Sequence, residues 1–254
     1  MSEFIDKFNL DGYVIIDLDD GEVDFSVIIS DMDNINSGTY KKLNPKIYHY
    51  NEYPRLIEAW RKSDNIKRLA LHPKIMSALR DLYKSEPVAF STINFTKGTE
   101  QPLHSDYFHF GSMPELMLAG VWVALEDIDP DAGPLSLIPG SQNSPIILPE
   151  DLGFTEPPRS TLEVKNNYTA YEEWVRNYIS VNNLKVSTPR LKKGQAVIWA
   201  ANTLHGAFAI KNKQITRYSQ VNHYHFEGCE FLYNPNFSSR KNYVYRDIQT
   251  SRIN

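Results

Sequence analysis

The chain has 254 residues, of which 41% are hydrophobic and 23% charged, and its formal net charge is −4. A chain of this length can bury a full core, and all-β folds of this size are often single domains, so we expect one domain over residues 1–254. The chain has no excess of basic residues that would bind the phosphate backbone of a nucleic acid. No apolar run approaches the roughly 20 residues of a membrane span. The composition therefore predicts a protein with neither nucleic-acid nor membrane partners.

Cysteine usage and the N-terminus predict the compartment. Cys229 is the only cysteine, which excludes a disulfide within the chain. The first residues lack the basic and apolar segments of a secretory signal. We therefore expect a cytoplasmic protein, in a reducing compartment where ferrous iron remains available.

The first third of the chain is predicted to be mainly helical. Residues 3–10 have apolar side chains at helical spacing and lead through Asp11-Gly12 into an apolar strand at 13–16. Residues 22–50 are ambiguous. Between 53 and 84 the apolar positions recur at three- and four-residue steps, and Pro73 is placed near a helix start, where its missing N–H costs nothing. A helical layer is expected there.

After Pro87 the pattern changes to short β-rich runs separated by glycine, proline, asparagine and aspartate. Such strands without β-α-β alternation predict an antiparallel barrel or double sheet. The predicted strands are 88–95, 101–108, 116–125, 135–138, 196–200, 207–211 and 215–226.

A long insertion interrupts these strands at about 145–190. It contains Pro149, Pro157 and Pro158 and a helical-looking stretch at 168–179. Insertions of this length are more often functional or mobile than filler, so we predict a lid over the site. The alternative is a decoration packed permanently against the barrel.

Three residues are predicted to bind one metal ion. His104 and Asp106 are two positions apart in a β-like stretch, so their side chains would share a face. His205, beside Gly206 at the end of an apolar strand, is the predicted third ligand. Two histidines and a carboxylate with open positions opposite suit Fe(II). Read singly, the H-x-D pair could be a charged surface loop and His205 an ordinary buried histidine.

Arg217 and Ser219 are predicted to share one face of a late strand. A guanidinium fork with an added hydroxyl suits a buried carboxylate, whereas the alternative for Arg217 is a surface ion pair. His223 and His225 continue the same face. We interpret them as pocket or core histidines in preference to a second metal site.

The order of these motifs resembles the phytanoyl-CoA dioxygenase-like family. Residues 8–14 begin the resemblance, followed by His104-Ser105-Asp106, then Gly-Pro-Leu-Ser-Leu-Ile-Pro-Gly-Ser at 133–141, His205-Gly206 and Arg217-x-Ser219. The resemblance implies a mainly β protein with flanking helices, built as a double-stranded β-helix or jelly roll.

The resemblance also implies a set of cofactors. It assigns Fe(II) to His104, Asp106 and His205. It assigns 2-oxoglutarate to the iron, with the distal carboxylate on Arg217 and Ser219, and leaves one iron position for O2. Trp122 resembles the aromatic wall of the cosubstrate pocket, and Gln101 could donate to a carboxylate there, although both are equally interpretable as core or rim residues. Ala207 departs from relatives that have a serine after His-Gly.

The implied activity is a dioxygenase that hydroxylates a small organic metabolite and releases succinate and CO2. Related halogenases have a small residue where Asp106 stands here, so hydroxylation is expected and chlorination is not, with desaturation and ring closure left open. The aromatic run at 107–110 could contribute alternate side chains to a substrate pocket. The alternative function is a cupin-like metal-binding module that binds or isomerises a small acid without 2-oxoglutarate, for which the Arg217 and Ser219 pair has no required role.

Overall fold

The computed structural model describes residues 2–38, 46–50, 53–154, 160–233 and 241–242. The helices are α1 Ser2–Asp11, α2 Phe25–Asn36, α3 Asp64–Ala70, α4 Pro73–Tyr83 and α5 Thr161–Val181, with 3-10 turns η1 Ala59–Arg61, η2 Asp106–Phe108, η3 Ser141–Asn143 and η4 Pro149–Leu152. The strands are β1 Tyr13–Asp17, β2 Lys46–Tyr50, β3 Tyr53–Ile57, β4 Pro87–Phe95, β5 Phe110–Met113, β6 Leu118–Ala124, β7 Leu135–Leu137, β8 Gln195–Ala200, β9 His205–Ala207, β10 Ser219–Phe226, β11 Glu230–Tyr233 and β12 Lys241–Asn242.

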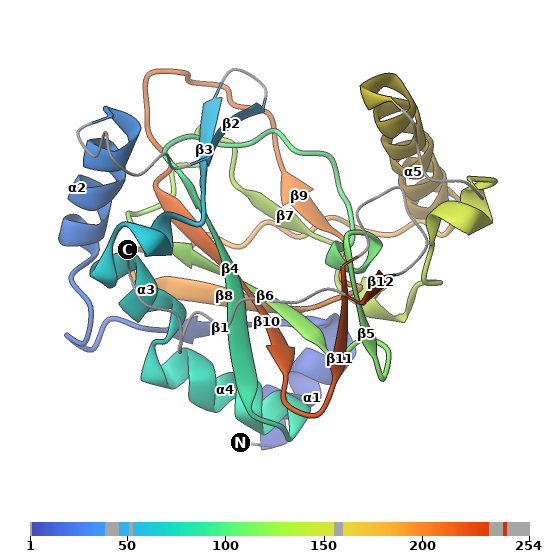
Figure 1. The fold of residues 1–254 in the computed structure, drawn as a ribbon, viewed down its shortest axis with the longest axis horizontal. Helices are drawn as coiled ribbons and strands as arrows, with labels where there is room; N and C mark the ends of the chain where they lie inside the picture. Colours follow the sequence, from blue (N-terminus) through green and yellow to red (C-terminus); the bar gives the residue numbers. More distant parts are fainter. Residues whose placement is uncertain (1, 39–45, 51–52, 155–159, 234–240, 243–254) are drawn as a thin grey trace.

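Within these residues the strands form one large sheet and two small ones, all with antiparallel pairing. The large sheet has the order β1-β8-β6-β10-β4-β3-β2. The small sheets are β12-β11-β5, on the side toward α5 in Figure 1, and β7-β9. This is the jelly roll with flanking helices that the sequence predicts, and the fold prediction is confirmed.

Strand alternation divides the core into two layers. On β6, Val121 and Val123 pack outward against the helices, whereas Trp122 and Ala124 face the interior of the roll. All seven residues of β6 are buried because both faces of this strand are covered. Polar side chains of the neighbouring strand β10, such as Ser219 and His223, are buried as well.

Helices α1 to α4 cover the outer face of the large sheet (Figure 1). Their starts follow from the sequence: Asp24 caps α2, Ser63 caps α3, and Pro73 opens α4 behind His72, whose Nδ1 accepts from the backbone N–H of Lys74. The helix predicted around 168–179 is confirmed as part of α5.

Three predicted elements are wrong. Residues 53–57 are strand β3 and not helix. In so short a run, Leu56 and Ile57 fit the apolar spacing of a helix or of a strand, and the pairing of this segment with β2 and β4 makes it a strand. Most of 207–211 is irregular, since the backbone N–H groups of Phe208 and Ile210 donate to Pro134 O and to the Glu100 carboxylate. The run 101–108 is a loop and a 3-10 turn, in which only His104 forms a β-bridge.

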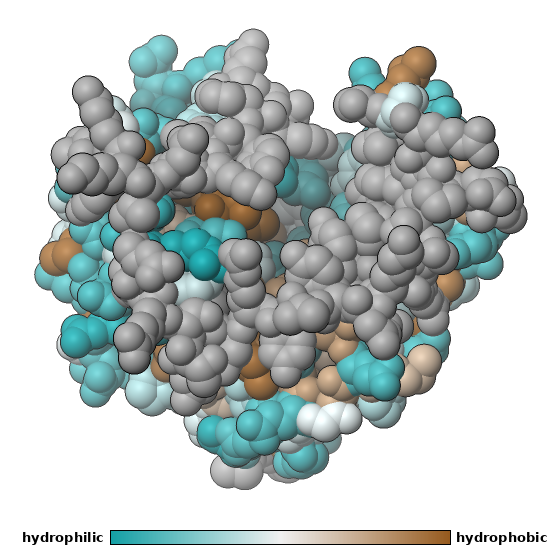
Figure 2. All heavy atoms as spheres, in the orientation of Figure 1, coloured by the Kyte–Doolittle hydropathy of each residue, from teal (hydrophilic) through white to brown (hydrophobic). Residues whose placement is uncertain are grey.

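Helix α5 lies on the side of the molecule opposite α2, α3 and α4 (Figure 1). Its inward face, including Tyr171 and Val175, packs with Phe108, Ile138 and Leu204 in a separate apolar cluster. The molecular face in Figure 2 is hollowed between α5 and the end of the sheet that carries β2 and β3. In the part of the chain that the structure describes, no helix is both long and apolar enough to cross a membrane.

Candidate functional site

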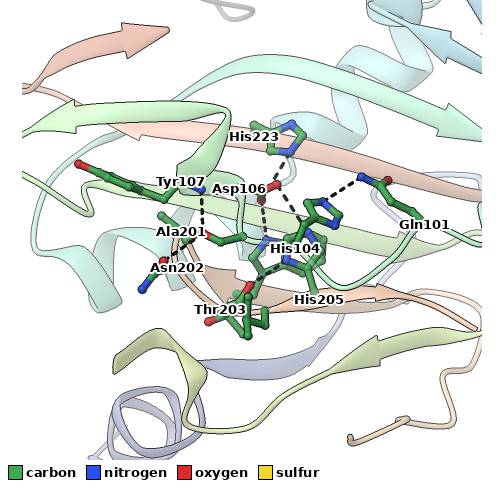
Figure 3. A network of polar contacts seen from close by, with 12 residues as sticks. Gln101, His104, Asp106, Tyr107, Ala201, Asn202, Thr203, His205 and His223 are labelled. Carbon is green, nitrogen blue, oxygen red and sulfur yellow. Dashed lines mark hydrogen bonds and ion pairs between the residues drawn. The ribbon is translucent and has the colours of Figure 1, made fainter. Parts of the chain in front are cut away.

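The structure brings together the three residues predicted to bind metal. His104 and His205 exchange two backbone hydrogen bonds of 2.9 Å across an isolated bridge, and Asp106 is the first residue of η2. One potential ligand atom from each side chain lies within 4.8 Å of the others, and all three residues are buried (Figure 3). The turn at Asp106, and not a shared strand face, aims its carboxylate at the two imidazoles. We call this group the His–Asp–His cluster.

Both histidines of the cluster are fixed in the same way. The Nδ1 atom of His104 lies 2.9 Å from the carbonyl oxygen of Pro102, and the Nδ1 atom of His205 lies 2.9 Å from that of Thr203. A carbonyl accepts only, so each Nδ1 carries a proton, and Nε2 is the atom of each ring that is left to bind a metal. Burial, reinforced by His205, lowers the pKa of His104 well below its usual range, which keeps this imidazole neutral.

The two oxygens of Asp106 have different surroundings. Oδ1 lies 3.5 Å from His205 Nε2. Oδ2 accepts a 2.7 Å hydrogen bond from the indole Nε1 of Trp199 and lies 3.7 Å from His223 Nε2. Burial resists ionisation, but His205 and His223 outweigh it and hold the pKa of this carboxyl well below its usual range. Asp106 is therefore an ionised oxygen donor.

The donor set and its spacing suit a six-coordinate divalent metal. Ligand atoms at 2.0–2.2 Å from one ion are about 3 Å apart when they occupy adjacent octahedral positions. Asp106 Oδ1 and His205 Nε2 lie 3.5 Å apart, and one donor atom from each of the three residues lies within 4.8 Å of the others. Two imidazoles and one carboxylate on one side leave the opposite side for other ligands, which is the arrangement of non-haem Fe(II) sites.

The segment that carries Asp106 is held rigidly from both sides. The backbone N–H of Ser105 donates to Tyr171 Oη of α5 at 2.8 Å, and the Ser105 hydroxyl donates to the carbonyl of Ala201 at 3.1 Å. The rings of Phe108 and Tyr171 stack with centroids 3.7 Å apart. Within the aromatic run 107–110, Tyr107 and Phe108 are thus core residues, whereas His109 and Phe110 are half-buried.

The strand predicted over 215–226 begins only at Ser219, as β10, so Arg217 lies two residues before it and not on a shared strand face. We call Arg217 and Ser219 the Arg–Ser pair. The side chain of Arg217 is 2% exposed, its Nη1 donates to the Gly133 carbonyl at 2.7 Å, and its guanidinium carbon lies 5.7 Å from the Trp122 ring centroid. Burial and the neighbouring Arg55 lower the pKa of Arg217 to about 10, so it stays charged at neutral pH. Arg217 Nε and Ser219 Oγ are buried without a hydrogen-bond partner among the described residues. Such groups are costly unless a ligand satisfies them.

The two remaining predicted site residues also line this region. Trp122 is buried beneath Arg217 on the inner face of β6. Gln101 places its amide nitrogen 3.1 Å from His104 Nε2 and 3.5 Å from Tyr168 Oη, and its carbonyl oxygen accepts from Arg55 at 2.9 Å. Gln101 is thus beside the atom of His104 that would bind a metal (Figure 3).

Sequence reasoning overlooked Arg55 and Trp199. Arg55 was hidden within a segment interpreted as helix, whereas the structure places it on β3, from which its guanidinium reaches Gln101. Trp199 precedes His205 in the predicted strand 196–200, but nothing local indicates that its indole reaches Asp106. His223, interpreted as a pocket or core histidine, is buried next to Asp106.

Comparisons with known proteins agree with this geometry. Curated protein sequences give no significant match. Among solved structures, the non-heme alpha ketoglutarate dependent epimerase SnoN from nogalamycin biosynthesis is 20% identical with a TM-score of 0.65, over 92% of this chain and 85% of that one. The carbocyclase SnoK from the same biosynthesis is 18% identical with a TM-score of 0.67, over 92% and 87%. EctD from S. alaskensis, solved with 2-oxoglutarate and 5-hydroxyectoine, is 18% identical with a TM-score of 0.67, over 89% and 76%. These likenesses show the shared fold.

The family follows from the sequence itself. A profile described as phytanoyl-CoA dioxygenase (PhyH) matches residues 8–218, which is most of the chain, and the match includes the His–Asp–His cluster and Arg217. The chain belongs to the phytanoyl-CoA dioxygenase family, whose members are Fe(II)- and 2-oxoglutarate-dependent enzymes.

Proposed function

We propose that this protein is a dioxygenase that uses Fe(II), 2-oxoglutarate and O2 to hydroxylate a small organic molecule. The His–Asp–His cluster would hold the iron through His104 Nε2, His205 Nε2 and Asp106. When bound, iron and 2-oxoglutarate would couple the reduction of O2 to two oxidations, the oxidative decarboxylation of 2-oxoglutarate to succinate and CO2 and the oxidation of a substrate C–H bond. The roles of the protein are to place the reactants and to exclude water.

One observation carries the proposal. The Arg–Ser pair presents a buried guanidinium Nε and a buried hydroxyl without partners among the described residues, and Ser219 belongs to β10, the strand whose His223 lies beside Asp106. An unpaired buried charge costs several kcal/mol, so the site calls for an anionic ligand. The distal carboxylate of 2-oxoglutarate meets this requirement, while its 2-oxoacid end would chelate the metal. In the alternative, a module that binds only a metal ion, the Arg–Ser pair would have no function.

Gln101 and Trp122 are assigned supporting roles. Without metal, the amide of Gln101 lies against His104 Nε2, and a metal at that atom would free the amide to donate to an oxygen of the cosubstrate. Trp122 provides a flat wall under Arg217, and its ring restricts the guanidinium to one orientation.

Hydroxylation is the reaction we favour within this family. Asp106 supplies a third protein ligand, so no position is vacated for a halide, and wild-type protein incubated with chloride is expected to give no chlorinated product. The similar structures carry the names of an epimerase and a carbocyclase, so the products must be identified directly. Mass spectrometry distinguishes them: hydroxylation adds one oxygen, ring closure or desaturation removes two hydrogens, and epimerisation leaves the mass unchanged.

The proposal is tested without knowing the substrate. Anaerobic protein with Fe(II) should develop the visible charge-transfer band of a chelated 2-oxoacid when 2-oxoglutarate is added. Aerobic incubation with a panel of small metabolites should then identify compounds that stimulate succinate release. The cupin-like alternative predicts no band and no succinate, and that result would overturn the proposal.

We also propose that the insertion at 145–190 shelters the site as a lid. Support comes from α5, whose Tyr171 contacts Ser105 next to Asp106 and whose Tyr168 contacts Gln101. Hydrogen exchange of α5 should slow when Mn(II), 2-oxoglutarate and a substrate found in the panel are added. Exchange that is slow and unchanged throughout would instead indicate permanent packing against the barrel.

A further inference from the structure

Trp199 touches two residues of the His–Asp–His cluster. Its side chain is 1% exposed, its Nε1 donates a 2.7 Å hydrogen bond to Asp106 Oδ2, and its ring centroid lies 4.2 Å from that of His205. Both partners of the hydrogen bond are buried, and one is ionised. Such charge-assisted bonds are stronger than bonds between neutral groups.

Gly120 makes this position of the indole possible. It lies directly opposite Trp199 in the pairing of β6 with β8. A Cβ atom at residue 120 would stand 2.4 Å from both Cε2 and Nε1 of Trp199, which is closer than real side chains approach. Only glycine therefore lets the indole lie flat on β6 with its N–H directed at Asp106.

The hydrogen bond distinguishes the two oxygens of Asp106. Oδ2 is engaged by the indole, while Oδ1 faces His205 Nε2 at 3.5 Å. We propose that Trp199 is a positioning residue that restricts Asp106 to binding metal through Oδ1 alone. A carboxylate that chelated the metal through both oxygens would occupy one position more of the six. Three single protein contacts and a bidentate 2-oxoacid leave one position, which the reaction with O2 requires.

This inference rests on the proposed function, since it takes the cluster to be the metal site. Trp199→Phe keeps an aromatic ring and removes the N–H. Outer partners of metal ligands typically contribute 10–100-fold to metal affinity, so we expect Mn(II) binding, followed by electron paramagnetic resonance, to weaken by about that factor. The anaerobic Fe(II) and 2-oxoglutarate band should also shift or lose intensity.

Trp60→Phe is the matched control for lost volume. Trp60 is fully buried among the outer helices, and its indole N–H has no hydrogen-bond partner among the described residues. This variant should lose thermal stability, as Trp199→Phe also should, because each replaces a buried indole with a smaller ring. Trp60→Phe should nevertheless keep wild-type Mn(II) affinity and the wild-type band. Equal losses of affinity in both variants would reduce the role of Trp199 to packing and overturn the inference.

Gly120→Ala tests the same contact from the other side. It keeps the indole N–H but displaces the ring, so it should reproduce the weaker Mn(II) binding and the altered band of Trp199→Phe. Wild-type affinity and spectrum in either folded variant would contradict the inference while leaving the proposed function intact. Absence of Mn(II) binding by the wild type would instead overturn both.

Discussion

The His–Asp–His cluster and the Arg–Ser pair are both buried but differ in how their polar atoms are satisfied. In the cluster, the atoms that would not touch a metal are already bonded: His104 Nδ1 to Pro102, His205 Nδ1 to Thr203, and Asp106 Oδ2 to Trp199. In the pair, Arg217 Nε and Ser219 Oγ have no partner among the described residues.

This difference teaches which part of the site is complete before ligands bind. The ligands of the cluster are preorganised by backbone carbonyls and an indole, so metal binding requires little ordering. The polar atoms of the pair instead remain desolvated and unpaired until a ligand binds, and the carboxylate of the proposed cosubstrate would satisfy them. We therefore expect the two regions to respond differently to mutation, and the predictions below test this difference.

The largest effect is expected from Asp106→Ala, which removes an ionised ligand. Because loss of even an outer partner costs about 10–100-fold in metal affinity, Mn(II) binding should weaken by more than about 100-fold. The 2-oxoglutarate affinity should fall with it, since the cosubstrate chelates the metal. Asp131→Ala removes an exposed carboxylate paired with Lys211 and serves as the control, with both affinities unchanged. Tight Mn(II) binding by Asp106→Ala would place the metal site elsewhere.

Arg217→Ala should separate the two regions. Breaking a buried charge-assisted pair costs about 2–5 kcal/mol, so anaerobic titration of the visible band should show 2-oxoglutarate affinity reduced by that amount. Mn(II) affinity should stay at the wild-type value, since Arg217 is not a member of the cluster. Arg217→Lys keeps the charge but lacks the guanidinium fork and should give an intermediate affinity. If Arg217→Ala binds 2-oxoglutarate as tightly as wild type, the assignment of the pair is wrong.

The sequence predicted which residues come together better than it predicted the local structure around them. The H-x-D spacing pointed to His104 and Asp106, which the structure does bring together, but through a wrong element, because a strand over 101–108 would also aim both side chains the same way. The actual turn depends on Ser105, whose hydroxyl accepts from the backbone N–H of Tyr107 and donates to Ala201, nearly a hundred residues later in the chain. The alternation of residue types within 101–108 does not indicate that contact.

The roles of Arg55 and Trp199 depend on sheet register, which a single sequence does not specify. Arg55 reaches Gln101 only because β3 adds to β4 at the edge of the large sheet. Trp199 reaches Asp106 only because Gly120 is its partner across the β6 and β8 pairing. Strand alternation, in contrast, is local, and it correctly grouped Ser219, His223 and His225 on alternate positions of one strand.

The smallest effects are expected from two serine variants, and these variants should differ in how they change the stability of the ligand-free protein. Ser219 is fully buried and its hydroxyl lacks a partner among the described residues, so Ser219→Ala should leave the ligand-free protein as stable as wild type or slightly more stable. Its 2-oxoglutarate affinity should nevertheless fall by about 1 kcal/mol, the value of one hydrogen bond. Ser105 is also buried, but its hydroxyl accepts from Tyr107 N–H and has two acceptors within reach of its one proton, the Ala201 carbonyl and Asn202 Oδ1. Ser105→Ala should therefore destabilise the ligand-free protein by about 1–3 kcal/mol in urea unfolding. If the two variants lose equal stability without ligand, the proposed difference between a preorganised cluster and an unsatisfied pair does not hold.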